Sequence, residues 1–128
     1  MTQDSKSGAE ASRWGRETAR KIAAAIGAST PTSTSNECLF EGRRVVIKCA
    51  APKTSSVGVT YLMLERISEV IGAFQLEGAI FDVWSLPTAV VLETLRPTAS
   101  RGASAGKVGI VSRATFYEKG KNVQRVTI

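Results

Sequence analysis

The sequence contains no histidine, only two cysteines, and no apolar run approaching the roughly 18 residues of a membrane-spanning helix. Without histidine, the chain cannot form a Ser-His-Asp triad, a Cys-His pair or a histidine-containing zinc site. Cys38 and Cys49 are too few for a four-thiolate zinc site or a disulfide framework, and both fit the role of small core residues. Acid–base or metal chemistry therefore falls to Asp, Glu, Lys, Tyr, Cys or bound water.

The length of the chain limits the number of domains, and its first residues indicate the cellular compartment. A chain of 128 residues fits one domain with a single core. The opening MTQDSKSGAE lacks the charged-then-apolar pattern of a secretory signal, so we expect a cytoplasmic protein without a membrane partner. The composition predicts a disordered N-terminus over residues 1–8 and a single domain over residues 9–128.

Positive charge is concentrated near the end of the chain. The 17 Lys and Arg residues exceed the 11 Asp and Glu residues by six, yet ten of each sign cancel through residue 95. The excess comes from Arg96, Arg101, Lys107, Arg113, Lys119, Lys121 and Arg125, which oppose only Glu118. Such a cluster is either a solubilising surface or a site for phosphates, because clustered cations gain affinity by releasing condensed counterions.

Hydrophobic spacing predicts the order of the elements. We expect a helix over about 9–26, a hairpin over 37–49, a helix over 60–75, a strand over 79–86 and a short helix over 88–95. A glycine- and serine-rich loop over 96–107 precedes two or three strands formed by KVGIVS, ATFYE and NVQRVTI. This order predicts an α+β fold, a single domain with one mixed sheet that contains the hairpin and has helices packed against it.

The hairpin is the clearest local signal in the sequence. Two β-rich runs flank Glu41-Gly42, a pair suited to a two-residue turn, which places Glu37 opposite Val46. Cross-strand partners point to the same side of a sheet. One face therefore carries Glu37, Leu39, Arg44, Val46 and Lys48. The other, more apolar face carries Cys38, Phe40, Val45, Ile47 and Cys49.

Glu37 and Lys48 are the strongest candidates for chemistry, because they share one face of the hairpin and lie near each other diagonally. A carboxylate beside a lysine at a strand end can hold a hard cation and a phosphate together. A simpler interpretation is also open, in which Lys48 is a solvated edge residue and Glu37 its surface ion partner.

The helix, the hairpin, the strand ending in Val46-Ile47-Lys48 and the following helix resemble the core of the PD-(D/E)xK, or restriction-endonuclease-like, superfamily. The resemblance covers about residues 9–86, which would form a nuclease-like core beside the basic loop and strands of residues 96–128. It implies a Mg²⁺-dependent DNA nuclease in which Glu37 and Lys48 are catalytic. Glu37, together with Glu17 from the preceding helix, would bind the metal.

One position departs from that family. Val46 stands where the superfamily has its second metal-binding carboxylate, and Glu65 or Glu69 would have to replace it. The resemblance therefore implies a nucleic-acid-binding protein, directed to DNA, whose acidic site is incomplete or rearranged. Whether such a site hydrolyses DNA is left open.

One further segment has the composition of a binding site. KTSSVGVT, residues 53–60, offers either an anion site or a helix cap from Ser55, Ser56 or Thr60.

In the nucleic-acid-binding hypothesis, the phosphate contacts come from Arg96, Arg101, Lys107 and Arg113. The alternative function is a non-enzymatic assembly module, a homodimer in the simplest case, that pairs through the exposed edge of the terminal strand NVQRVTI.

Overall fold

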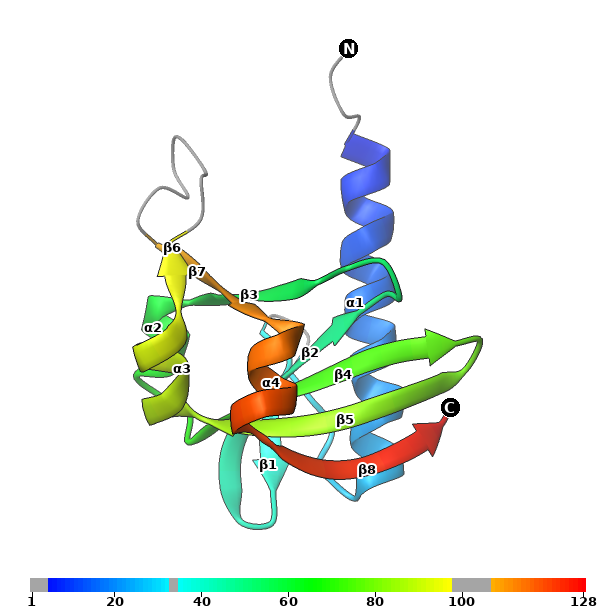
Figure 1. Cartoon of the computed structure of the whole chain (residues 1–128). Helices are drawn as coiled ribbons and strands as arrows, with labels where there is room; N and C mark the ends of the chain where they lie inside the picture. The colour runs from blue at the N-terminus through cyan, green and yellow to red at the C-terminus, as the bar shows by residue number, and fades with distance from the viewer. Residues whose placement is uncertain (1–4, 33–34, 98–106) are drawn as a thin grey trace.

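Two β-sheets and four helices make up the computed structural model, which describes residues 5–32, 35–97 and 107–128 (Figure 1). The elements in chain order are α1 (Ser5–Ile26), β1 (Glu37–Phe40), β2 (Arg43–Ala50), β3 (Ser56–Thr60), α2 (Tyr61–Leu64), β4 (Glu69–Glu77), β5 (Ile80–Pro87), α3 (Thr88–Thr94), β6 (Arg96–Pro97), β7 (Val108–Ser112), α4 (Arg113–Lys119) and β8 (Lys121–Thr127). A mixed sheet has the order β1-β2-β4-β5-β8, and a smaller sheet has the order β3-β7-β6. The predicted α+β class with a mixed sheet is confirmed, and the smaller sheet was not expected.

The hairpin of β1 and β2 has the predicted register, with Glu37 opposite Val46 and Phe40 opposite Arg43. Glu41 and Gly42 both adopt positive φ angles, 51° and 79°, which is the backbone geometry of a two-residue hairpin turn that matches strand twist. β2 then runs parallel to β4, and β3 with α2 forms the connection between them.

The mixed sheet is covered on both faces. α1 packs on one face, where Ala19, Ile22 and Ala23 meet the predicted apolar side of the hairpin and the inner residues of β4 and β5. The smaller sheet and helices α2, α3 and α4 cover the other face (Figure 1). Phe74, Phe116 and Val46 are fully buried in that second layer. The central strands β2 and β4 are therefore enclosed between two apolar layers.

The helix predicted over residues 60–75 is wrong. The structure ends β3 at Thr60, forms only the short α2, and then enters β4 at Glu69. Residues 70–74 of β4 are buried on both faces, so their side chains show no alternation between polar and apolar. A continuous apolar run of this kind also fits helical spacing, which is why the pattern indicated a helix.

Two other boundaries differ from the prediction. ATFYE forms α4 instead of a strand, because Ser112 caps the helix by accepting a hydrogen bond from the Thr115 amide. α1 begins at Ser5, within the segment that was expected to be disordered. Most of the predicted glycine- and serine-rich loop, residues 98–106, lies outside the described residues.

Candidate functional site

A basic cleft lies between the turn that precedes β3, the end of α3 with β6, and the start of α4. Its volume is about 760 Å³. The described residues that line it are Pro52, Lys53, Thr54, Ser55, Ser56, Thr94, Arg96, Ile110, Ser112, Arg113, Ala114, Thr115 and Tyr117. This set contains three cations, six hydroxyl-bearing Ser and Thr side chains and no carboxylate, so its chemistry favours an anion.

The pairing of β3 with β7 assembles the cleft. Ser56 lies opposite Ser112 in that antiparallel pair, which brings the residue 51–55 turn to the first residue of α4. The Arg113 amide donates a hydrogen bond of 2.7 Å to the Ser55 carbonyl. Residues distant in the sequence therefore form one wall of the cleft.

Arg113 is the fixed cation of the cleft. Its Nη2 donates hydrogen bonds of 2.9 Å to the carbonyl oxygens of Ala51 and Thr54. Its Cζ lies 5.0 Å from the centroid of the Phe74 ring, a cation–π distance. These acceptors are neutral, so they orient the guanidinium group without cancelling its charge.

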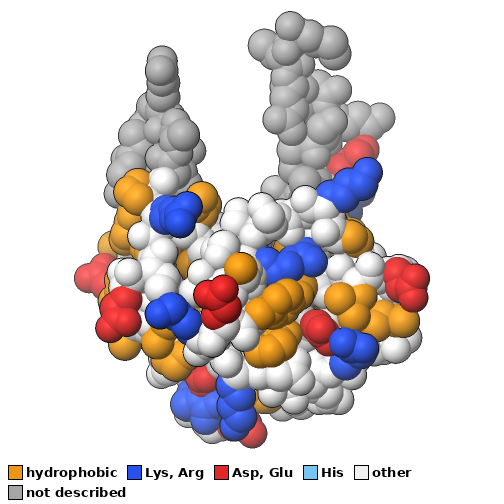
Figure 2. Space-filling model, viewed as in Figure 1, with side chains coloured by type: hydrophobic (Ala, Val, Ile, Leu, Met, Phe, Trp, Pro, Cys, Tyr) orange, Lys and Arg blue, Asp and Glu red, His pale blue; other side chains and the backbone are white. Residues whose placement is uncertain are grey.

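Three other arginines differ from the cations of the cleft in their partners. Arg43, Arg66 and Arg125 each form an ion pair with a carboxylate. Across residues 5–32, 35–97 and 107–128, no carboxylate lies within 4.0 Å of the charged groups of Lys53, Arg96 or Arg113. The space-filling view shows Lys and Arg side chains beside an apolar patch near the middle of the face that carries α4 (Figure 2).

The four basic residues predicted to contact phosphate fall into three groups. Arg96 and Arg113 line the same cleft. Lys107 is exposed just before β7, outside the cleft lining, and its carbonyl accepts a hydrogen bond from the Tyr61 amide. Arg101 lies outside the described residues.

Lys53 was missed as a site residue, although the segment KTSSVGVT carried the signal. Residues 53–56 of that segment line the cleft, as its interpretation as an anion site requires. Thr60 at its end caps α2 by accepting a hydrogen bond of 3.1 Å from the Met63 amide. The helix cap is therefore confirmed at Thr60, and the anion site stays a prediction.

Glu37 lies in a separate hollow of about 490 Å³ beside the hairpin. Its carboxylate accepts hydrogen bonds from Arg66 Nη2 at 2.9 Å and from Ser35 Oγ at 2.6 Å. The hydrogen bond from Arg66 is the largest cause that lowers the pKa of Glu37, with partial burial opposing it. The ion partner of this carboxylate is therefore Arg66, which the sequence did not indicate.

Lys48 lies on β2 opposite Gly72 of β4, two residues beyond Val46, the last residue of β2 that pairs with β1. It is partly buried, and burial lowers the pKa of its ammonium group. In the described part of the chain, no carboxylate forms an ion pair with it. Among the described residues, the structure therefore shows no ion pair between Lys48 and Glu37.

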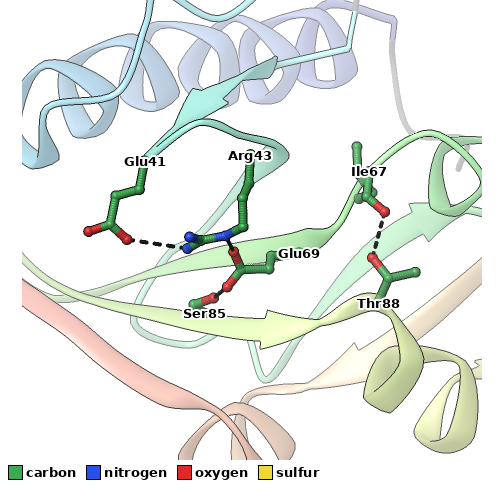
Figure 3. A network of polar contacts seen from close by, with 6 residues as sticks. All are labelled: Glu41, Arg43, Ile67, Glu69, Ser85 and Thr88. Atoms are coloured by element: carbon green, nitrogen blue, oxygen red, sulfur yellow. Dashed lines mark hydrogen bonds and ion pairs between the residues drawn. The ribbon is translucent and has the colours of Figure 1, made fainter.

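The other candidate carboxylates also lie apart from Glu37. Glu17 is exposed on α1, which covers the opposite face of the mixed sheet. Glu69 binds Arg43 and Ser85, and Arg43 also contacts Glu41, in a polar network across β2, β4 and β5 (Figure 3). Glu65 is exposed after α2, next to Arg66, which donates to the Glu37 carboxylate.

The position of the missing carboxylate is part of the core, since Val46 has no exposed surface. Among the residues whose placement is described, no three Cys, Asp or Glu side chains come together to hold a metal ion. Arg66 donates hydrogen bonds to both oxygens of the Glu37 carboxylate, and Ser35 donates to one of them, so this carboxylate as it stands does not fit a Mg²⁺ site, because the ion would have to displace a bound cation.

Comparison with known proteins does not indicate a function, so the functional argument depends on the residues of the chain. The chain matches no protein-family model, and no curated protein is significantly similar to it in sequence. No helix in the described part of the chain is both long and apolar enough to span a membrane.

Proposed function

We propose that this chain binds DNA through the sugar–phosphate backbone, which lies in the basic cleft. The observation that carries the proposal is the convergence of Lys53, Arg96 and Arg113, whose charges no carboxylate neutralises within the described residues. A polyanion that enters the cleft satisfies these charges and releases its own counterions, which supplies the free energy of binding.

The guanidinium, ammonium and hydroxyl groups of the cleft would recognise phosphate in different ways. Guanidinium groups present paired N–H donors that match the geometry of phosphate oxygens, whereas the Lys53 ammonium acts as a point charge. Ser and Thr hydroxyls along the cleft add neutral donors. These groups contact the backbone and carry no base-specific information, so we expect binding without strong sequence preference.

The salt dependence of affinity tests the proposal. Fluorescence anisotropy with a labelled DNA duplex should show that log Kd rises with log salt concentration, with a slope of about 0.9 per phosphate contact. Lys53→Ala and Arg96→Ala should each weaken binding and lower that slope by roughly 0.9.

Lys21→Ala is the matched control. Lys21 is an exposed cation on α1, on the other face of the mixed sheet, so its loss changes the net charge equally without touching the cleft. Equal loss of affinity in Lys21→Ala and Arg96→Ala would show that DNA is attracted by the net charge of the protein and does not bind specifically in the cleft. Affinity that does not change with salt would overturn the proposal.

Hydrolysis of DNA is a separate prediction that rests on the resemblance to the PD-(D/E)xK superfamily. The Glu37 carboxylate, which the resemblance makes catalytic, is bound by Arg66. The test is incubation of plasmid and single-stranded DNA with Mg²⁺ or Mn²⁺, with Lys48→Ala beside the parent. Cleavage by the parent that Lys48→Ala abolishes would establish that hydrolysis requires Lys48, and equal cleavage by both would exclude the predicted site.

The outer strand β8 favours a second candidate function, which is self-assembly. β8 pairs with β5 on one side and forms the edge of the mixed sheet, and five of its seven residues are exposed. An edge of this kind can add a strand from a second copy of the chain. Sedimentation over a wide concentration range tests it, and a strict monomer would exclude a homodimer.

A further inference from the structure

Tyr117 brings an exposed aromatic ring into the basic cleft. It lies on α4, is 40% exposed and lines the same cavity as Arg96 and Arg113. Exposed aromatic rings on a protein surface offer stacking area at low entropic cost, since few torsions must be fixed. Phosphate binding alone does not use this ring.

The ring of Tyr117 is held in place by two other aromatic side chains. Its centroid lies 5.0 Å from that of Trp84 and 5.7 Å from that of Phe74. Phe74 is fully buried and packs edge-on against Phe116 at 5.1 Å. A ring supported in this way is rigid before a ligand arrives, so a stacking partner loses little free energy in ordering it.

The charged group of Arg113 and the ring of Tyr117 are neighbours. Arg113 and Tyr117 both contact Phe74, the first through its guanidinium group and the second through its ring. Only one side chain therefore separates a fixed cation from an exposed aromatic surface. A nucleotide has the same arrangement, because a phosphate is joined through a sugar to a base with a π face.

From this arrangement we infer that the cleft takes single-stranded DNA, with one base stacked on Tyr117 and the flanking phosphates on Lys53, Arg96 and Arg113. The inference rests on the proposed DNA binding and narrows it. A duplex keeps its bases stacked inside and offers only its backbone to the cleft, whereas a single strand offers both base and phosphate. Basic grooves with aromatic platforms bind single strands in this way without reading sequence.

The test compares two DNA probes and three Tyr117 variants. The probes are labelled oligothymidylate and a duplex of the same length, measured by anisotropy at one salt concentration. We expect the parent to bind oligothymidylate at least tenfold more tightly than the duplex. Tyr117→Ala should lose roughly 5- to 150-fold for the single strand, which is the range for one lost base stack, and change little for the duplex.

Tyr117→Phe and Tyr117→Leu separate stacking from packing. Phenylalanine retains the ring and should keep single-strand affinity within about twofold, whereas leucine retains apolar contact without a π face and should lose affinity as alanine does. Thermal unfolding of each variant monitors the fold. Full affinity in Tyr117→Leu would overturn the stacking role.

Three further outcomes are decisive. If Arg96→Ala lowers the salt slope while Tyr117→Ala changes nothing, or if the duplex binds more tightly, DNA binding stands and the single-strand inference falls. If neither probe binds with a salt-dependent affinity, the proposed function itself falls. Competition by thymidine monophosphate at the concentration where the oligonucleotide competes would make the cleft a free-nucleotide site and overturn the inference.

Discussion

Arg113 lies over the ring of Phe74, with its Cζ 5.0 Å from the ring centroid, and links a surface turn to the core of the protein. The same side chain donates two hydrogen bonds to carbonyls of the turn, at Ala51 and Thr54. One residue therefore contributes to the shape of the basic cleft and to its charge, and the two contributions can be separated by substitution.

Substitution of Arg113 should affect both folding and binding. Arg113→Ala removes the side-chain donor from the Thr54 carbonyl, leaves the Ala51 carbonyl with only the Thr54 amide, and removes the cation–π contact, so we expect the free energy of unfolding to fall by about 1–3 kcal/mol. Arg113→Lys keeps the charge but not the paired donors, so its free energy of unfolding should lie between those of the parent and Arg113→Ala. Urea titration measures these differences. Lys21→Ala, the exposed control on α1, should stay within about 0.5 kcal/mol of the parent.

Gly72 should not tolerate a side chain. A Cβ at this position would lie 2.7 Å from Phe74 Cζ and 3.0 Å from Phe116 Cε1, and both rings are fully buried. Gly72→Ala should therefore destabilise the protein by about 1–3 kcal/mol through overpacking. Because Tyr117 packs on Phe74, the same variant should also weaken binding of single-stranded DNA.

Gly15 supplies the opposite case for the same substitution. It lies inside α1, and a Cβ there would meet no atom within 4 Å. Gly15→Ala should raise the free energy of unfolding by up to about 1 kcal/mol, since alanine favours the helix and restricts the unfolded chain. Equal effects at Gly15 and Gly72 in urea titrations would contradict the packing around Phe74.

The parts of the fold that were predicted correctly are those with local causes. The hairpin register follows from Glu41-Gly42 and from alternation in two short strands, and all of this information lies within 14 residues of sequence. β4 could not be assigned in the same way. α1 covers one of its faces and the second layer, with β3, β7 and the three short helices, covers the other, so only the tertiary structure distinguishes such a strand from a buried helix.

The site shows the same division between local and tertiary information. Clustered charge indicated Arg96 and Arg113 as phosphate contacts, because net charge can be counted along the sequence. Their meeting with Lys53 depends on the pairing of β3 with β7, which no local pattern specifies. Glu37 likewise binds Arg66 from a segment that the sequence placed in a helix.

The ion pair between Glu37 and Arg66 should make stability depend on pH in the acid range. Hydrogen bonds from Arg66 and Ser35 lower the pKa of Glu37 in the folded state below its ordinary 4.5. A lowered folded-state pKa contributes stability that is present above the unfolded-state value and is lost as pH falls through the folded-state value. The parent should therefore exceed Glu37→Gln in stability at pH 7, and the difference should shrink on acidification.

Urea titrations between pH 7 and pH 3 measure that difference. Glu77→Gln, at an exposed position at the end of β4, controls for the loss of one negative charge. A difference between the parent and Glu37→Gln that stays constant down to pH 3 would show that Arg66 does not stabilise the charged carboxylate.

Lys48 should be a cost to stability at neutral pH. Burial lowers the pKa of its ammonium group below the ordinary 10.5, so the unfolded chain binds this proton more tightly than the folded protein does. The penalty is therefore fully present below the folded-state pKa and disappears as pH rises towards 10.5. Lys48→Met keeps the length of the side chain without its charge, and should raise the free energy of unfolding at pH 7 by about 1 kcal/mol.

Lys21→Met, an exposed lysine with the same substitution, should leave stability within about 0.5 kcal/mol of the parent. The gain in Lys48→Met should decline between pH 7 and pH 10 in urea titrations, because the parent recovers stability as Lys48 loses its proton. A loss of stability in Lys48→Met would mean that the ammonium group makes a favourable contact in the folded protein. The DNA affinity of Lys48→Met should equal that of the parent, since Lys48 does not line the basic cleft.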